Sequence, residues 1–149
     1  MPRAKHVALT RLFASVLIAA LAMSGCADKG PTFVESGTSY TKATALELLA
    51  ESDTSRFAQH PTSEADALRH TALTALRRHG ASASATADLI TRTFPQAAHG
   101  VPVYVERGSF EGVPATILVE ATGPASGKLG TKRLWAIGGD GRVLFVATR

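Results

Sequence analysis

The fold is decided by residues 101–122, VPVYVERGSFEGVPATILVEAT. Apolar residues alternate with others along this stretch, beginning with Val101, Val103 and Val105. An alternation with a period of two is typical of a β-strand. Residues 113–122 continue the pattern after Glu111-Gly112, a pair suited to a turn. The stretch therefore predicts two strands that pair with each other.

Two further strands are predicted at the C-terminal end. Residues 132–138 and 142–148 flank Gly139-Asp140-Gly141, and Asp-Gly between two apolar runs is a strong signal of a β-hairpin. Together with the first two strands, they predict a four-stranded antiparallel meander.

Three helices are predicted before the strands. Apolar residues recur at helical spacing in residues 42–52, 64–79 and 84–94. Thr41 and Ser84 are suited to N-caps, and Gly80 to a helix C-terminus. We expect the helices to pack on one face of the sheet, in an α+β fold. Which face they cover does not follow from the sequence.

The N-terminal segment has the pattern of an export signal. Arg3, Lys5 and Arg11 precede an apolar run, Leu12–Met23, that contains no charged residue. As a helix this run would reach only about 18 Å, against about 30 Å for the hydrocarbon core of a bilayer. A permanent membrane span is therefore not expected here.

The signal ends in Leu21-Ala22-Met23-Ser24-Gly25-Cys26, which resembles the lipobox of bacterial lipoproteins. The resemblance covers residues 1–26 only, and it implies cleavage after Gly25 and a diacylglyceryl group on Cys26. We expect a signal peptide over residues 1–25, a flexible tether over 26–41 and a single domain over 42–149. The protein would be anchored by lipid to the cell membrane on its exported side. An ordinary secretory signal or a signal anchor is the alternative.

Charge and composition exclude several classes of protein. Removing the signal takes three basic residues and no acid, which lowers the net charge from +4 to +1, so nucleic acid is not an expected partner. The single cysteine excludes an intramolecular disulfide framework and a CxxC redox site.

No local pattern of a catalytic or metal site is found. His60, His70, His79 and His99 form no pair at metal-binding spacing. Glu106 could meet Glu120 or Glu111 across the first hairpin as an acid–base pair, but we expect these acids to face solvent. We therefore predict no catalytic residue, no metal and no cofactor.

Trp135 is the side chain of the mature domain that most suggests a binding surface. Trp135 and Leu134 lie on opposite faces of their strand, so the indole lies on the open face of the sheet if Leu134 faces the helices. With Tyr104 and Leu118 beside it, it would form a candidate binding patch. The alternative is that Trp135 fills the core while Leu134 faces outward.

These observations favour a non-catalytic binding or accessory module of the cell envelope, which would contact an envelope protein or another envelope component. An envelope hydrolase without a local motif and a small-ligand carrier are the alternatives. Beyond the signal, the sequence resembles no family that would supply the ligand, the process or the oligomeric state.

Overall fold

The C-terminal part of the chain forms the four predicted antiparallel strands in sequence order. The computed structural model describes residues 30–94 and 100–149. The strands are β3 (Val101–Phe110), β4 (Val113–Thr122), β5 (Thr131–Gly138) and β6 (Val143–Thr148). Gly141, at φ +84°, follows Asp140 in the turn between β5 and β6, so the Asp-Gly hairpin is confirmed.

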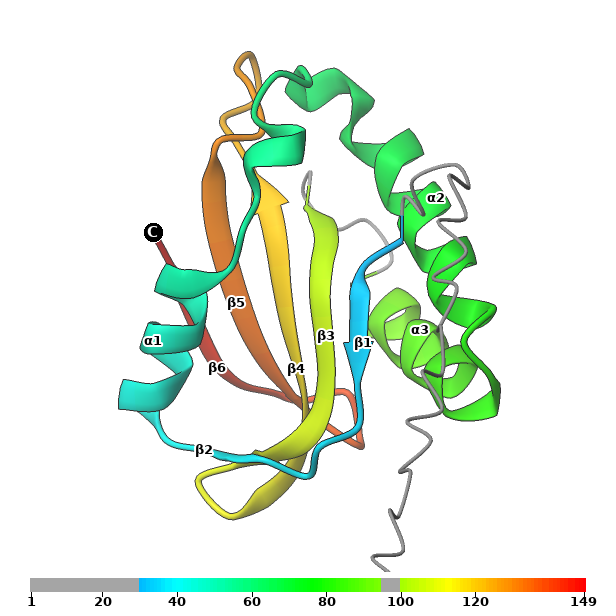
Figure 1. Ribbon diagram of the computed structural model, residues 1–149, viewed down its shortest axis with the longest axis vertical. Coiled ribbons are helices and arrows are strands. Elements are labelled where there is room, and N and C mark those ends of the chain that lie inside the picture. Colours follow the sequence, from blue (N-terminus) through cyan, green and yellow to red (C-terminus); the bar gives the residue numbers. More distant parts are fainter. Residues whose placement is uncertain (1–29, 95–99) are drawn as a thin grey trace, which may run out of the picture.

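The sheet has six strands rather than the predicted four, and it is mixed. β1 (Thr32–Val34) and β2 (Ser39–Tyr40) both pair parallel to β3, while the other pairs are antiparallel (Figure 1). The tether predicted over residues 26–41 departs from the structure in its described part, because residues 32–34 and 39–40 are paired and Tyr40 is buried. The two strands were missed because each is only two or three residues long.

The three helices are α1 (Lys42–Glu51), α2 (Ala65–Arg77) and α3 (Ala81–Thr93). Two short 3₁₀ turns, Ser55–Phe57 and Thr62–Glu64, lie between α1 and α2. Thr41 caps α1 as predicted, in a reciprocal capping box with Thr44. The third helix begins three residues before the predicted Ser84, directly after Gly80, whose φ of +110° suits the sharp turn from α2.

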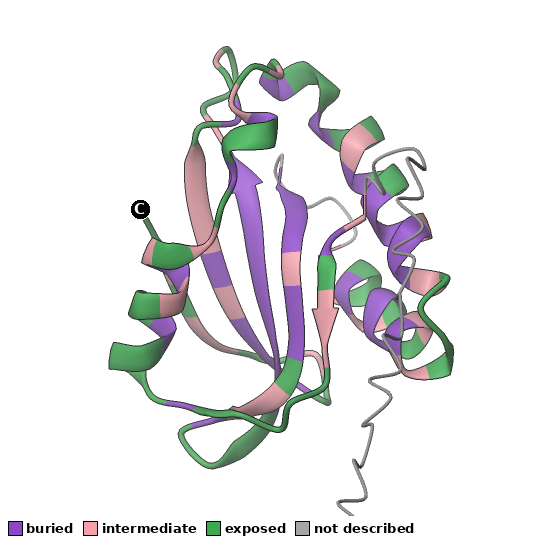
Figure 2. Cartoon of the chain, viewed as in Figure 1, coloured by how far each residue is buried: buried purple, intermediate pink, exposed green. Residues whose placement is uncertain are grey.

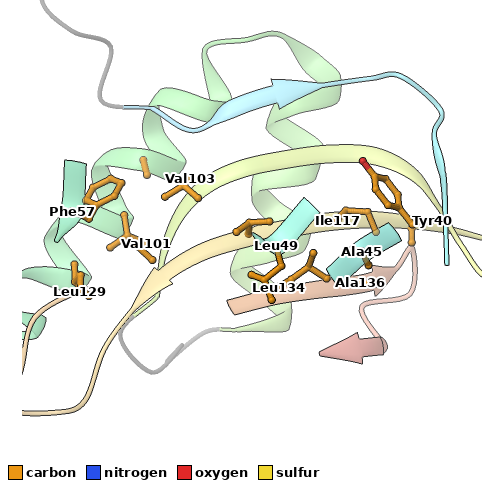
Figure 3. Packing of buried hydrophobic residues seen from close by; sticks show 14 of the residues in the cluster. Tyr40, Ala45, Leu49, Phe57, Val101, Val103, Ile117, Leu129, Leu134 and Ala136 are labelled. Carbon is orange, nitrogen blue, oxygen red and sulfur yellow. The ribbon is translucent and has the colours of Figure 1, made fainter. Parts of the chain in front are cut away.

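The helices are not gathered on one face of the sheet. Ala45 and Leu49 of α1 share a cluster with Ile117 and Leu134, as Figure 3 shows. The neighbouring β4 residue, Leu118, belongs to a second cluster, which contains α3 residues Ala83, Ala87 and Ile90. Consecutive strand residues face opposite sides, so α1 and α3 cover opposite faces. The central strands β3 and β4 are accordingly buried along most of their length (Figure 2).

A bulge in β3 sets which side chains face which layer. The pairing of β3 with β4 shifts between Pro102 and Tyr104. Proline has no N–H to donate to a neighbouring strand, and in sheets it is found at bulges. Beyond the shift, Val105 pairs with Leu118 and faces α3, whereas Glu106 pairs with Ile117 and faces α1. The simple alternation in the sequence would have placed each on the other face.

Candidate functional site

An open cleft of about 550 Å³ lies beside α3. Helix α3 contributes Ser82, Ala85, Thr86, Leu89 and Arg92 to its lining. The ends of β3 and β4 contribute Arg107, Gly108, Pro114, Ala115 and Thr116, and the connecting segments contribute Glu35, Gly37 and Gly139. A volume of this order fits a small-molecule ligand.

The cleft follows from the two faces of α3. Ala83, Ala87 and Ile90 are fully buried against the sheet. Ser82, Leu89 and their neighbours recur at helical spacing along a different stripe of the helix, which faces the cleft. Several residues of that stripe are small. The helix therefore leaves open space above the C-terminal end of β3 and the N-terminal end of β4.

Arg107 is held at one end of the cleft by two partners. Its Nη1 donates to Ser82 Oγ at 2.6 Å and to Glu35 Oε1 at 3.2 Å. Ser82 Oγ in turn donates to Glu35. The side chains of Arg107 and Glu35 are 55% and 50% exposed, and such ion pairs contribute little to stability. The contacts therefore serve mainly to orient the guanidinium.

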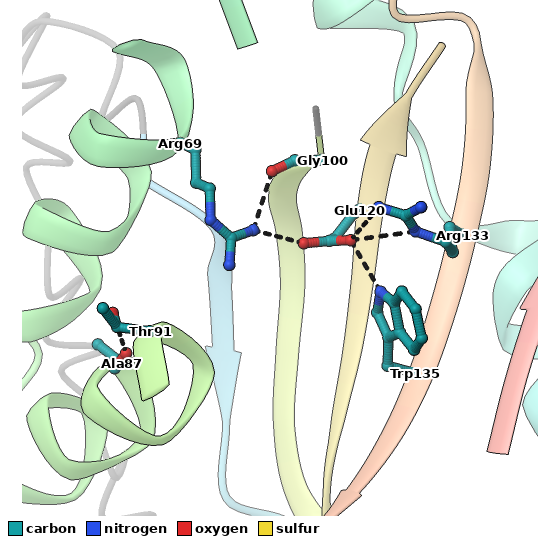
Figure 4. Close-up of polar contacts among 7 residues, drawn as sticks. All are labelled: Arg69, Ala87, Thr91, Gly100, Glu120, Arg133 and Trp135. Atoms are coloured by element: carbon teal, nitrogen blue, oxygen red, sulfur yellow. Dashed lines mark hydrogen bonds and ion pairs between the residues drawn. The ribbon is translucent and has the colours of Figure 1, made fainter. Parts of the chain in front are cut away.

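A second polar cluster centres on Glu120 of β4, beneath α2 (Figure 4). Its Oε1 accepts from Arg69 Nη1 at 2.6 Å. Its Oε2 accepts from Trp135 Nε1 at 2.8 Å and from Arg133 Nη2 at 3.2 Å. The carboxylate is 1% exposed and has charged or polar donors on both oxygens, so it holds α2 and β5 to β4 rather than offering a free group.

A third cluster centres on Glu106, on the α1 side of the sheet. Tyr40 and Tyr104 each donate a hydroxyl to Oε2 at 2.5 Å, and Ser36 donates to Oε1. Burial by itself raises the pKa of the Glu106 carboxyl, but these hydroxyl donors outweigh it and leave the pKa below its usual value. Burial and the contact with Glu106 raise the pKa of Tyr40 to about 12 and that of Tyr104 further.

The predicted binding patch does not assemble. Leu118 and Trp135 are cross-strand neighbours, but Tyr104 pairs with Val119 and faces the α1 layer instead. Leu118 is fully buried, and the Trp135 ring lies 4.6 Å from the ring of Phe94. The patch required one uncovered face of the sheet, and helices lie on both faces. Trp135 is half-buried against the second cluster, and Leu134 on the other face is fully buried, so the alternative in which Leu134 faces outward does not describe the structure either.

Two of the three predicted acidic residues differ from expectation, whereas Glu111 is exposed as expected. Glu106 and Glu120 are both 1% exposed rather than facing solvent, and they lie on opposite faces of the sheet. Glu111 lies in the β3–β4 turn at φ +49° and accepts a bond from the Lys42 backbone. None of these acids meets another, so no acid–base pair forms among them.

The remaining predicted residues do not form a site. His60 Nδ1 contacts Glu64 at 2.8 Å on an exposed surface, and His79 lies near Phe33. No group of three metal-binding side chains is found within residues 30–94 and 100–149. Cys26 and His99 lie outside the described residues.

The cleft residues were missed by reasoning from sequence. Ser82, Arg92 and Arg107 belong to no motif, and they come together only because α3 crosses the ends of β3 and β4. The sequence did carry one signal, a stripe of small and polar residues along 82–92 beside the apolar stripe of Ala83, Ala87 and Ile90.

No protein-family model, curated protein or solved structure matches the chain. In the part of the chain that the structure describes, no helix has both the length and the apolar character needed to span a bilayer.

Proposed function

We propose that the protein is an exported lipoprotein, anchored to the cell membrane through Cys26, that binds an envelope component in the α3 cleft without transforming it. Two or three acyl chains on one cysteine make a durable anchor, because each buried CH₂ contributes about 0.8 kcal/mol. The lipobox-like end of the signal supports this half of the proposal.

The observation that supports binding is the oriented Arg107 at one end of a ligand-sized cleft. A guanidinium fixed before the ligand arrives loses less side-chain entropy on binding. The cleft also lies between a helix and the sheet, which is where a carrier of small ligands would hold its cargo. A small envelope component is therefore favoured over a protein docked on a flat sheet face.

The test places a photo-reactive amino acid at Ala85, an exposed residue of the cleft, in the full-length protein in its native membrane. The matched control carries the same group at Ala67, an exposed alanine of α2 outside the cleft. We expect a recurrent adduct at position 85 that is absent at position 67 and is lost in Arg107→Gln. Equal adducts at both positions would contradict binding in the cleft.

The anchor is tested on the same preparation by the mass of the N-terminal peptide. We expect a chain that begins at Cys26 and carries a diacylglyceryl group. A chain that begins elsewhere, or an unmodified cysteine, would contradict the lipoprotein assignment and leave the cleft result standing.

A hydrolase is a second candidate because Ser82 Oγ donates to the Glu35 carboxylate inside the cleft. A serine beside a base is the arrangement of an activated nucleophile, although a carboxylate is a weaker base toward a hydroxyl than histidine. A fluorophosphonate that labels Ser82, and fails to label Ser82→Ala, would favour the enzyme. An unlabelled Ser82 would favour the binding protein.

A further inference from the structure

The cleft has an arginine toward each end. Arg107 lies at the Ser82 end, since its Nη1 is 2.6 Å from Ser82 Oγ. Arg92 lies ten residues further along α3, which corresponds to about 15 Å along a helix axis. The β5–β6 turn lies at that far end, because a Cβ built on Gly141 would be 3.2 Å from Thr93 Oγ1.

Both guanidinium groups have donors to spare. Arg107 uses only Nη1 in its contacts with Ser82 and Glu35. Arg92 is exposed and makes no ion pair with any residue in the two described ranges. Glu35 offsets one of the two positive charges, so the lining of the cleft keeps a net charge of +1. A guanidinium binds carboxylate and phosphate groups through two parallel N–H donors.

The surface between the two arginines is largely apolar. Ala85 and Leu89 line it from the helix, and Pro114 and Ala115 line it from β4. A ligand that reaches from one arginine to the other would lay an uncharged segment across these side chains, where removal of apolar surface from water favours binding.

We propose that the cleft binds an elongated small ligand with an anionic group, carboxylate or phosphate, at each end and an apolar stretch between them. The rise along α3 between residues 82 and 92 makes the separation of its anionic groups on the order of 15 Å. This inference rests on the proposed binding function and specifies its ligand class.

The test titrates the full-length lipoprotein, in a non-ionic detergent, with α,ω-dicarboxylates from butanedioate to decanedioate. Calorimetry or NMR shifts of the α3 amides report binding, and monocarboxylates of equal chain length serve as the reference. We expect affinity to rise with chain length. A dicarboxylate of sufficient length should bind at least about tenfold more tightly than its monocarboxylate, a difference of about 1.4 kcal/mol, because only the dicarboxylate can make bidentate contacts with both arginines. A bisphosphate of the same length that binds more tightly still would support the proposal and assign phosphate as the end group.

Arg92→Gln and Arg107→Gln should each reduce the preference for the dicarboxylate to that of a monocarboxylate. Arg78→Gln is the matched control, since Arg78 is an exposed arginine just beyond α2 and outside the cleft. Circular dichroism checks that each variant is folded. Equal affinity for mono- and dicarboxylates, or full binding by Arg92→Gln, would overturn the proposal. A cross-link at position 85 that persists in that case would leave the binding function intact.

Discussion

Glu106 and Glu120, on adjacent strands of one hairpin, point their buried carboxylates to opposite faces of the sheet. Glu106 pairs with Ile117 on the α1 side, and Glu120 lies three residues beyond Ile117 on the other side. Both are 1% exposed. The donors around the two carboxylates differ. Glu120 accepts hydrogen bonds from arginine side chains and from the indole N–H of Trp135, whereas Glu106 accepts them from hydroxyl groups.

The two carboxylates connect different layers of the fold. Glu120 links β4 to Arg69 of α2 and to β5. Glu106 links β3 to Ser36 and Tyr40, which lie on the edge formed by β1, β2 and their connection. A buried charge whose donors are removed is costly, so each network specifies how its layer docks. Removing one carboxylate should therefore affect one side of the molecule more than the other.

Glu120→Gln should lower the free energy of unfolding by about 3 kcal/mol, because it leaves the buried guanidinium of Arg69 without its counter-charge. Urea denaturation at neutral pH measures the loss. Glu47→Gln, an exposed change on α1, is the control and should stay within about 0.5 kcal/mol of the parent protein.

The same network predicts non-additivity. In Arg69→Met the cation is already absent, so adding Glu120→Gln should cost less than it does in the parent chain. If the two losses simply add, the ion pair between Arg69 and Glu120 does not couple α2 to the sheet.

The tyrosines should resist ionisation in the native protein. The chain has two, Tyr40 and Tyr104, and both donate to Glu106. Burial and the neighbouring carboxylate raise the pKa of Tyr40 to about 12 from its usual 10.0, and raise that of Tyr104 as well. Tyrosinate absorbance should therefore show no titration near pH 10 in the folded state. The control in concentrated urea should show both groups titrating near pH 10, and native titration at that pH would contradict the Glu106 network.

Stability at low pH should depend on Glu106. Its hydroxyl donors leave the folded-state pKa below the usual 4.5, despite the opposing effect of burial. The unfolded chain therefore binds its proton first as the pH falls. The resulting stabilisation is complete above pH 4.5 and is lost as the pH falls through the folded-state value. Glu106→Gln should make the acid limb of the stability curve shallower, as measured by urea midpoints from pH 6 to pH 3, whereas Glu47→Gln should leave its slope unchanged.

The sequence predicted those parts of the fold that local chemistry determines. The predictions of the Asp-Gly turn after β5 and of the Thr41 cap of α1 were both correct. Turn geometry and an N-cap hydrogen bond each depend on only a few neighbouring residues. The predictions of β3 and β4 were also correct, because two runs rich in valine and other strand-forming residues flank a short turn that contains glycine.

The face that each strand residue occupies was not predictable in the same way. The bulge at Pro102 reverses the alternation within β3, so Val105 and Glu106 exchange faces relative to the simple pattern. β1 and β2 are too short for periodicity and are held by pairing with a strand some seventy residues away. The cleft likewise depends on contacts between residues far apart in the chain, because it forms where α3 crosses the sheet. The sequence therefore contains little indication of it.

Gly108→Ala should loosen the β1–β2 edge. A Cβ at position 108 would lie 2.3 Å from the Thr38 carbonyl oxygen, a backbone atom that cannot rotate away. That same carbonyl accepts from Ser109 N–H at 2.9 Å, so its displacement breaks the parallel pairing of β2 with β3. The strain should cost about 1–3 kcal/mol of the free energy of unfolding.

Hydrogen exchange distinguishes this local effect from general destabilisation. In Gly108→Ala the amides of Gly37 and Ser109, both bonded across this edge, should exchange faster than those of β5. Gly130→Ala is the matched control, because a Cβ there meets nothing within 4 Å, and a glycine-to-alanine change without strain is neutral or stabilises by up to about 1 kcal/mol. Uniformly faster exchange throughout the sheet would contradict a local effect. It would show that the β1–β2 edge unfolds only together with the whole domain.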